Sequence, residues 1–268
     1  MARLASKWIA PALIAAAAIA ATTACGGPPP TVPDSGKQLK NINLVQGTSN
    51  PAQPGTGSPA ADPQAQQQTW AKMVQDITTV RQTTFNLKCE LVGYFVSIKD
   101  GKTGSTLSDF YWQKPSTTAL VVNKSSDGAT QGTKIVWAGG AQMRVKTKFL
   151  GWWMTTSLDI HHEYARDQRG YFIDQTGIGP TMDTLLDPRN QVTVQGTGTM
   201  DGLPIMKVAM KSPRSLKGVA SEVFVVDTQR KVPLVREMYD ASNKLVFRIQ
   251  MNKLVLNSQL PAKTFSVD

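Results

Sequence analysis

Short runs rich in valine, threonine and aromatic residues, separated by turns that contain glycine or aspartate, fill most of the chain after residue 84. Runs of this kind are typical of β-strands, and such short turns join strands that pair antiparallel. The expected strands form two sets: residues 85–99, 105–114, 117–124, 132–140 and 141–147, and then residues 190–200, 203–211, 221–228, 232–240 and 245–257. The sequence therefore predicts an antiparallel sheet of many strands.

Two segments carry helical spacing instead. In residues 66–85 the apolar side chains recur every three or four residues, which predicts an amphipathic helix with a broad apolar face. That face consists of Trp70, Met73, Val74, Ile77 and Val80. Pro180 can begin a second helix, which Pro188 ends. The expected fold class is α+β and mainly β: a curved antiparallel half-barrel sheet capped by helices on its concave side.

The first 24 residues have the layout of a secretory signal peptide. Arg3 and Lys7 precede an alanine-rich apolar run, and "TTAC" then places Cys25 directly after the cleavage point. "TTACGG" resembles a bacterial lipobox, whose cysteine carries acyl chains such as palmitate and so anchors the protein to a membrane. The alternative is ordinary cleavage near Ala24, with Cys25 an incidental thiol.

The segment that follows is expected to be a tether. Residues 25–65 are rich in proline, glycine, serine and glutamine, and they hold too few apolar residues to offset the entropy of ordering. The remaining residues, 66–268, are enough for one domain with its own core.

The balance of charges favours a lipid surface over a nucleic acid. The formal net charge is +10, and removal of Arg3 and Lys7 leaves about +8. The densest basic cluster is Arg144, Lys146 and Lys148, and no arginine-rich stripe is present. We therefore expect mild attraction to anionic lipids and no nucleic-acid partner, with a merely solubilising surface as the alternative.

Cys89 is the only cysteine that remains beyond Cys25. It alternates with Leu87 and Leu91 on one face of an expected strand, so we interpret it as a small packed side chain.

The C-terminal half resembles the ending of the LolA, LolB and LppX-type lipoprotein carriers. Its matching elements are a strand that ends in Asp227, a strand opened by Pro233, a turn with Asp240 and a long strand with Phe247. The middle of the chain, with "SLD", Arg169 and "IDQTGIG" before a helix, resembles a related uncharacterised envelope lipoprotein domain. The resemblance implies a half-barrel closed by helices, with an apolar cavity that holds acyl chains.

One stretch, "KTKFLGWWMTTSLD", concentrates apolar side chains that no single strand or helix face can bury together. It is a candidate ligand-binding or membrane-contacting site, because adjacent tryptophans and nearby lysines suit the level of lipid headgroups. The candidate residues are Phe149, Leu150, Trp152, Trp153 and Met154. The competing interpretation is a core strand with both tryptophans packed under a helix.

No catalytic arrangement can be assembled from the sequence, so we expect no enzyme and no cofactor. His161 and His162 are adjacent, which on a strand directs them to opposite faces, and we expect no metal site there. There is no serine elbow, no evident cysteine–histidine pair and no phosphate-binding glycine loop.

These observations predict an exported, monomeric lipoprotein, anchored to the cell membrane or the outer membrane and facing the periplasm or the cell exterior. It would bind or shuttle a lipid or the acyl chains of a lipoprotein in an apolar cavity, with the helix that carries Trp70, Met73, Val74 and Ile77 as a lid. The alternative is a non-enzymatic structural or sensor protein of the envelope that binds a protein partner through the same fold.

Overall fold

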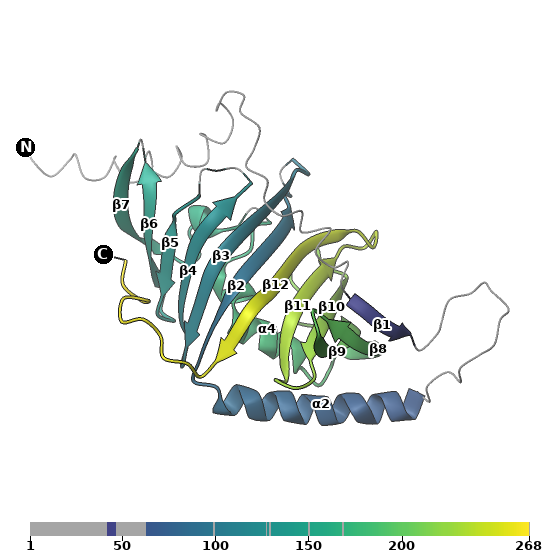
Figure 1. Ribbon diagram of the computed structural model, residues 1–268. Helices are drawn as coiled ribbons and strands as arrows, with labels where there is room; N and C mark the ends of the chain where they lie inside the picture. The colour runs from purple at the N-terminus through teal and green to yellow at the C-terminus, as the bar shows by residue number, and fades with distance from the viewer. Residues whose placement is uncertain are drawn as a thin grey trace, which may run out of the picture. The chain divides into compact units, whose positions relative to one another are not determined.

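The computed structural model describes residues 42–46, 63–98, 100–126, 128, 130–149, 151–167 and 169–267 (Figure 1). The signal peptide, Cys25 and most of residues 25–65 lie outside these described residues, so the predictions made for them stay predictions. The described chain falls into two compact units. The first unit holds residues 85–177 and 252–267, and the second unit holds residues 42–46, 63–84 and 178–251.

The first unit is an antiparallel meander in which each strand pairs with the next along the chain. Its strands are β2 (Asn86–Val96), β3 (Thr103–Gln113), β4 (Thr117–Ser125), β5 (Lys134–Trp137), β6 (Gln142–Phe149) and β7 (Trp152–Asp159). The last residues of β12 (Leu245–Leu256) lie beside β2, and β7 is the strand at the other edge. A 3₁₀ turn, η3 (Glu163–Ala165), and a short helix, α3 (Ile173–Thr176), follow β7.

Side chains from two non-strand segments cover the two faces of this meander. On one face, Val267 packs against Ala119 and Val136, and we call this the tail face. On the other face, Ile160 packs against Met143 and Val145, and we call this the loop face. Val136 lies opposite Arg144 in the ladder and Val145 lies opposite Ile135, so successive residues of β6 alternate between the two faces.

The second unit combines antiparallel strands with the two longer helices. Its strands are β1 (Ile42–Gln46), β8 (Gln191–Met200), β9 (Leu203–Lys211), β10 (Ser221–Asp227), β11 (Val232–Tyr239) and the first residues of β12, paired in that order. Its helices are α2 (Pro63–Thr83) and α4 (Ile178–Leu185). Almost every residue of β10 and β11 is buried, including Phe224 and Met238, which are fully inaccessible to solvent. The core of this unit therefore lies on both faces of its central strands.

The predicted fold class is confirmed: the chain is mainly an antiparallel sheet with few helices. All ten predicted strands are present, and β9 has the predicted bounds. The helix expected to begin at Pro180 starts at Ile178, which places the proline in the first turn, where its missing N–H costs no hydrogen bond.

Two elements differ from the expectations. The strand β7 begins within the apolar stretch around Trp152, which was not among the ten expected strands and had a core strand only as its competing interpretation. The strand β1 lies within residues 25–65, which were expected to be a tether, and it pairs with β8. Its sequence, INLVQ, is an apolar run within that otherwise polar segment.

Candidate functional site

The candidate apolar stretch forms the tip of the edge hairpin β6–β7. Phe149 pairs with Trp152, and Lys148 pairs with Trp153. Gly151, at the turn, has a φ of 87°, a conformation that glycine adopts without strain. Phe149 is described only as the last residue of β6, and Leu150 lies outside the described residues.

The two tryptophans are exposed, not packed in a core. The exposed fraction is 78% for Trp152 and 49% for Trp153, and Trp152 is the most exposed of the large apolar residues that the structure describes. Met154, two residues further along β7, is half-buried.

The two rings project to opposite faces of the hairpin. The pairing with Phe149 puts Trp152 on the loop face, in line with Met154 and with Leu158, which packs at the edge of the Met143–Ile160 core. The pairing with Lys148 puts Trp153 on the tail face. One side of the tip therefore continues the apolar core, and the other side carries an aromatic ring next to a cation.

Trp153 is held in a defined position by two contacts. The Lys148 Nζ lies 5.7 Å from the centroid of the Trp153 ring, within the range of a cation–π interaction. The end of the same ring lies so close to Gly132 that a Cβ atom there would come within 2.7 Å of it. The absence of a side chain at residue 132 therefore makes room for the ring.

A further exposed apolar residue lies at the same end of the first unit's sheet. In a meander, alternate connections share one end, and the β2–β3 turn, the β4–β5 loop and the β6–β7 turn are such connections. Ile98 lies in the β2–β3 turn with an exposed fraction of 64%. Ile98, Trp152 and Trp153 thus share one end of the sheet, whereas Phe85, at 52% exposed, precedes β2 at the opposite end.

The segment between β7 and α3 contains the charged groups that the sequence analysis considered for chemistry. His161 Nε2 lies 2.8 Å from Asp174 Oδ2, and the His161 ring packs edge-on against Phe172. Within the part of the chain that the structure describes, no group of three or more His, Cys, Asp or Glu side chains is placed to hold a metal ion.

Asp167 and Arg169 organise the turn after this histidine. The Asp167 carboxylate accepts hydrogen bonds from the backbone N–H groups of Arg169 and Tyr171. Burial raises the pKa of Asp167 to about 6, against an ordinary value of 3.8. Arg169 is buried, and its Nη1 donates to the carbonyl of Val96 at the end of β2.

Cys89 is buried, as predicted, and burial raises the pKa of its thiol to about 12. The thiolate, which is the reactive form, is therefore disfavoured.

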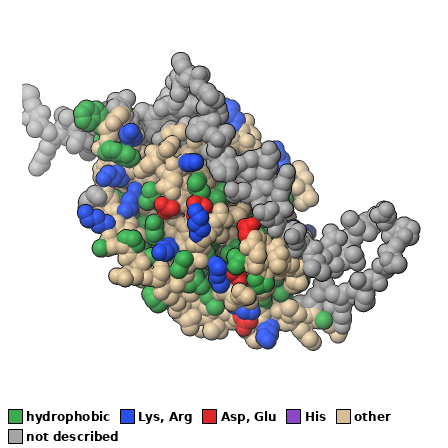
Figure 2. All heavy atoms as spheres, viewed as in Figure 1, with side chains coloured by type: hydrophobic (Ala, Val, Ile, Leu, Met, Phe, Trp, Pro, Cys, Tyr) green, Lys and Arg blue, Asp and Glu red, His purple; other side chains and the backbone are tan. Residues whose placement is uncertain are grey.

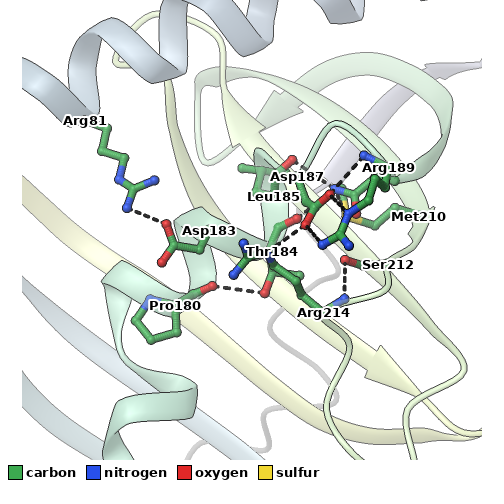
Figure 3. A network of polar contacts seen from close by, with 11 residues as sticks. Arg81, Pro180, Asp183, Thr184, Leu185, Asp187, Arg189, Met210, Ser212 and Arg214 are labelled. Atoms are coloured by element: carbon green, nitrogen blue, oxygen red, sulfur yellow. Dashed lines mark hydrogen bonds and ion pairs between the residues drawn. The ribbon is translucent and has the colours of Figure 1, made fainter.

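The expected lid helix is packed along the predicted face. In α2, Met73 and Ile77 are buried, and Trp70 and Val74 are half-buried. Its polar side makes two ion pairs within the second unit: Asp76 with Lys231 at 2.9 Å, and Arg81 with Asp183 of α4 (Figure 3). The two helices are thus tied to each other and to the β10–β11 turn.

A polar cluster terminates α4. Asn190 Nδ2 donates to the carbonyls of Thr184 and Leu185, which have lost their helical partners. The Asp187 carboxylate accepts hydrogen bonds from Arg189 and Arg214, and these arginines hold its pKa well below its usual range (Figure 3). These contacts fix the loop between α4 and β8.

A buried ion pair lies where α4 meets the sheet of the second unit. Arg236 Nε donates to Glu222 Oε2 at 2.7 Å, Arg236 Nη1 donates to Thr181 of α4, and Ser215 donates to the other oxygen of Glu222. Arg236 Nη2 is buried with no partner among the described residues. This pair was not predicted from the sequence, although a charged residue at an inward position of an apolar strand is a signal for one.

No helix among the described residues is both long and apolar enough to cross a bilayer.

No protein-family model matches the chain, and no curated protein sequence matches it. Solved structures do. The Mycobacterium tuberculosis lipoprotein LppX is 11% identical, with a TM-score of 0.45 over 72% of this chain and 98% of that one. A DUF1329 family protein from Desulfovibrio piger is 14% identical, with a TM-score of 0.42 over 75% and 97%. A LolA superfamily protein from Nitrosomonas europaea is 10% identical, with a TM-score of 0.33 over 73% and 96%.

At these identities and scores the likeness concerns the fold, and the ligands of the similar proteins say nothing about this chain.

Proposed function

We propose that this protein is a lipoprotein of the cell envelope, anchored through Cys25, that binds or shuttles a lipid or the acyl chains of a lipoprotein. In this proposal the β6–β7 tip is its contact with the membrane. One observation carries it: the adjacent residues Trp152 and Trp153 are both exposed at an edge-hairpin tip, one on each face, at the same end of the sheet as the exposed Ile98. Exposed apolar side chains of this kind are stabilised only when another apolar surface covers them.

The size of this gain suits a reversible contact. A tryptophan side chain can bury about 150–250 Å², and apolar area contributes about 25 cal/mol per Å², so each ring supplies a few kcal/mol. The acyl chains at Cys25 would hold the chain to the membrane, and the hairpin tip would bring the domain itself to the membrane surface. Without the tip, the anchor would leave the domain at the end of its tether.

The helices α2 and α4 are the proposed lid. The apolar face of α2, with Met73 and Ile77, gives a bound hydrocarbon chain a surface to contact, and the ion pairs on its polar side are exposed enough to open at small cost. Trp70 and Val74 are only half-buried, and an entering acyl chain would take the place of the contacts that they make.

Lipid carriage is tested in two steps. Mass spectrometry of the purified protein identifies any lipid that co-purifies, and after delipidation a fluorescent fatty-acid probe reports whether uptake saturates. A co-purified lipid or saturable uptake is the expected result. A protein that holds no lipid and takes up no probe refutes lipid carriage.

The membrane contact is tested separately with the variant Trp152→Ser/Trp153→Ser. In co-sedimentation with phosphatidylcholine vesicles, we expect it to bind much more weakly than the unsubstituted protein. Phe85→Ser is the matched control, because Phe85 is also an exposed aromatic residue but lies at the opposite end of the sheet. Equal binding by all three proteins, each shown to be folded, removes the tip from the function.

A second candidate function rests on the edge strand. Among the described strands, β7 pairs only with β6, and its outer residues Thr155, Thr156 and Ser157 are exposed. An open edge of this kind can accept an extended segment of a protein partner. This candidate predicts that a partner protein, and no lipid, co-purifies, and that a proline in place of Thr156 abolishes the complex.

A further inference from the structure

The tail face of the edge hairpin carries a row of positive charges. Lys134 of β5 lies directly opposite Lys146 of β6. Because side chains on a strand alternate, Arg144 and Lys148 project to the same face as Lys146. Figure 2 shows Lys and Arg side chains gathered over the part of the surface where Figure 1 places β5, β6 and β7.

Like charges directly opposite each other in a ladder destabilise a sheet. Burial, and secondarily the charge of Lys146, lower the pKa of Lys134. The Lys134 ammonium donates to the backbone carbonyl of Lys263 at 3.0 Å. A carbonyl satisfies a hydrogen bond but leaves the charge uncompensated.

The nearest carboxylates in the ladder are engaged or distant. Across the strands from Lys146, the same row runs through Lys134 and Val121 to Asp109, about 10 Å from Lys134 at two strand spacings. Glu90, opposite Asp109, pairs with Lys253 at 3.2 Å. Within the described residues, no carboxylate lies within ion-pair distance of Lys134, Lys146 or Lys148.

The row is continuous with the tryptophan tip. Lys148 lies next to Phe149 in β6, directly opposite Trp153, and Lys146 lies about 7 Å behind it along the strand. A tryptophan at a bilayer takes the level of the headgroups. Insertion of the tip to the level of Trp153 would therefore bring Lys148, and then Lys146, to the plane of the lipid phosphates.

We infer that the lysine row of the tail face, Lys134, Lys146 and Lys148, binds the phosphate groups of anionic phospholipids, so that the hairpin docks on anionic membranes. This inference rests on the proposed membrane contact and names the lipid class that it selects. The charge complementarity and the continuity with Trp153 favour a lipid surface over an acidic protein. An acidic protein would use the row without needing the tip.

The experiment compares vesicles of phosphatidylcholine alone with vesicles that also contain phosphatidylglycerol. We expect the unsubstituted protein to bind the anionic vesicles more tightly, by roughly fivefold for each lysine that reaches the surface. The variant Lys146→Gln/Lys148→Gln should lose this preference and keep its binding to neutral vesicles. About 1 M salt should abolish the same preference, since it shortens the screening length to about 3 Å.

Two controls show whether a lost preference for anionic vesicles comes from the lysine row, from the lower net charge or from misfolding. Lys211→Gln/Lys244→Gln removes two exposed lysines of the second unit and should keep the preference for anionic vesicles. Lys146→Gln alone should leave the melting temperature unchanged or raise it, because it relieves the repulsion on Lys134.

The outcomes distinguish the two proposals. Binding to neither kind of vesicle refutes the membrane contact and this inference together. Equal binding to both kinds, or a preference that survives Lys146→Gln/Lys148→Gln, refutes the lysine row and leaves the tryptophan contact standing. Loss of the preference in Trp152→Ser/Trp153→Ser as well supports docking through the tip.

Discussion

Arg236 Nε lies 2.7 Å from Glu222 Oε2, and both side chains are almost completely buried where α4 meets the sheet of the second unit. The pair is linked to Thr181 of α4 and to Ser215, so it joins a helix, two strands and a loop of this unit. The guanidinium also lies over the Phe224 ring, 5.6 Å from its centroid.

Arg236→Met should destabilise the second unit strongly. The substitution leaves Glu222 buried without its cation, which typically costs about 3–5 kcal/mol. Urea unfolding followed by circular dichroism measures the loss. The double variant Glu222→Leu/Arg236→Met should lose much less, because no charge remains buried. This account is contradicted if Arg236→Met loses less unfolding free energy than Glu222→Leu/Arg236→Met does.

Asp167→Asn should flatten the dependence of stability on pH. Burial raises the pKa of Asp167 to about 6 in the folded protein, so the folded state binds this proton more tightly than the unfolded state does. Its contribution to stability is therefore fully present below the ordinary pKa of 3.8 and is lost as the pH rises through about 6. The change amounts to at most about 3 kcal/mol.

The measurement is urea unfolding of Asp167→Asn and of the unsubstituted protein at several pH values between 3.8 and about 6. The difference in unfolding free energy between Asp167→Asn and the unsubstituted protein should grow in favour of the variant as the pH rises. A difference that is constant with pH shows that Asp167 titrates normally.

Gly132→Ala should disturb the hairpin tip more than an ordinary glycine substitution does. Gly132 has a φ of 82°, and a Cβ atom there would meet the Trp153 ring at 2.7 Å. Gly101→Ala is the matched control, because Gly101 has a φ of 69° with open space around it and shares only the backbone strain, about 1–2 kcal/mol. Tryptophan fluorescence should change in Gly132→Ala and stay the same in Gly101→Ala.

Asn190→Ala should loosen the end of α4. Its Nδ2 donates to two carbonyls of the last turn, and their loss is expected to cost about 1–3 kcal/mol. Amide hydrogen exchange should quicken in α4 before the rest of the second unit is affected. Gln191→Ala, at the exposed neighbouring residue, should leave exchange unchanged. Equal exchange in both variants rules out the capping role.

Much of the fold follows from local sequence. "LPIMKVAMK" is a short run rich in apolar residues, and the turns at its ends contain glycine or proline, so β9 is predicted with its bounds. Cys89 is recognised as packed because it alternates with Leu87 and Leu91 on one strand face. Where local pattern and tertiary pairing agree, the sequence alone is sufficient.

The rest depends on partners that are distant in sequence. "WWMTTSLD" lacks a clear alternation, and it becomes β7 because β6 offers it a ladder. β1 pairs with β8, more than a hundred residues away, and its five-residue apolar run is too short to predict a strand without that partner. Arg236 and Glu222 find each other only once β10 and β11 are aligned.

The opposite orientation of Trp152 and Trp153 sets a direction of approach. A flat surface that slides against either side of the hairpin touches one indole and leaves its neighbour in water. Only a surface met end-on engages both. The doublet thus distinguishes a head-on encounter from a lateral one, which a single tryptophan at the same turn could not do.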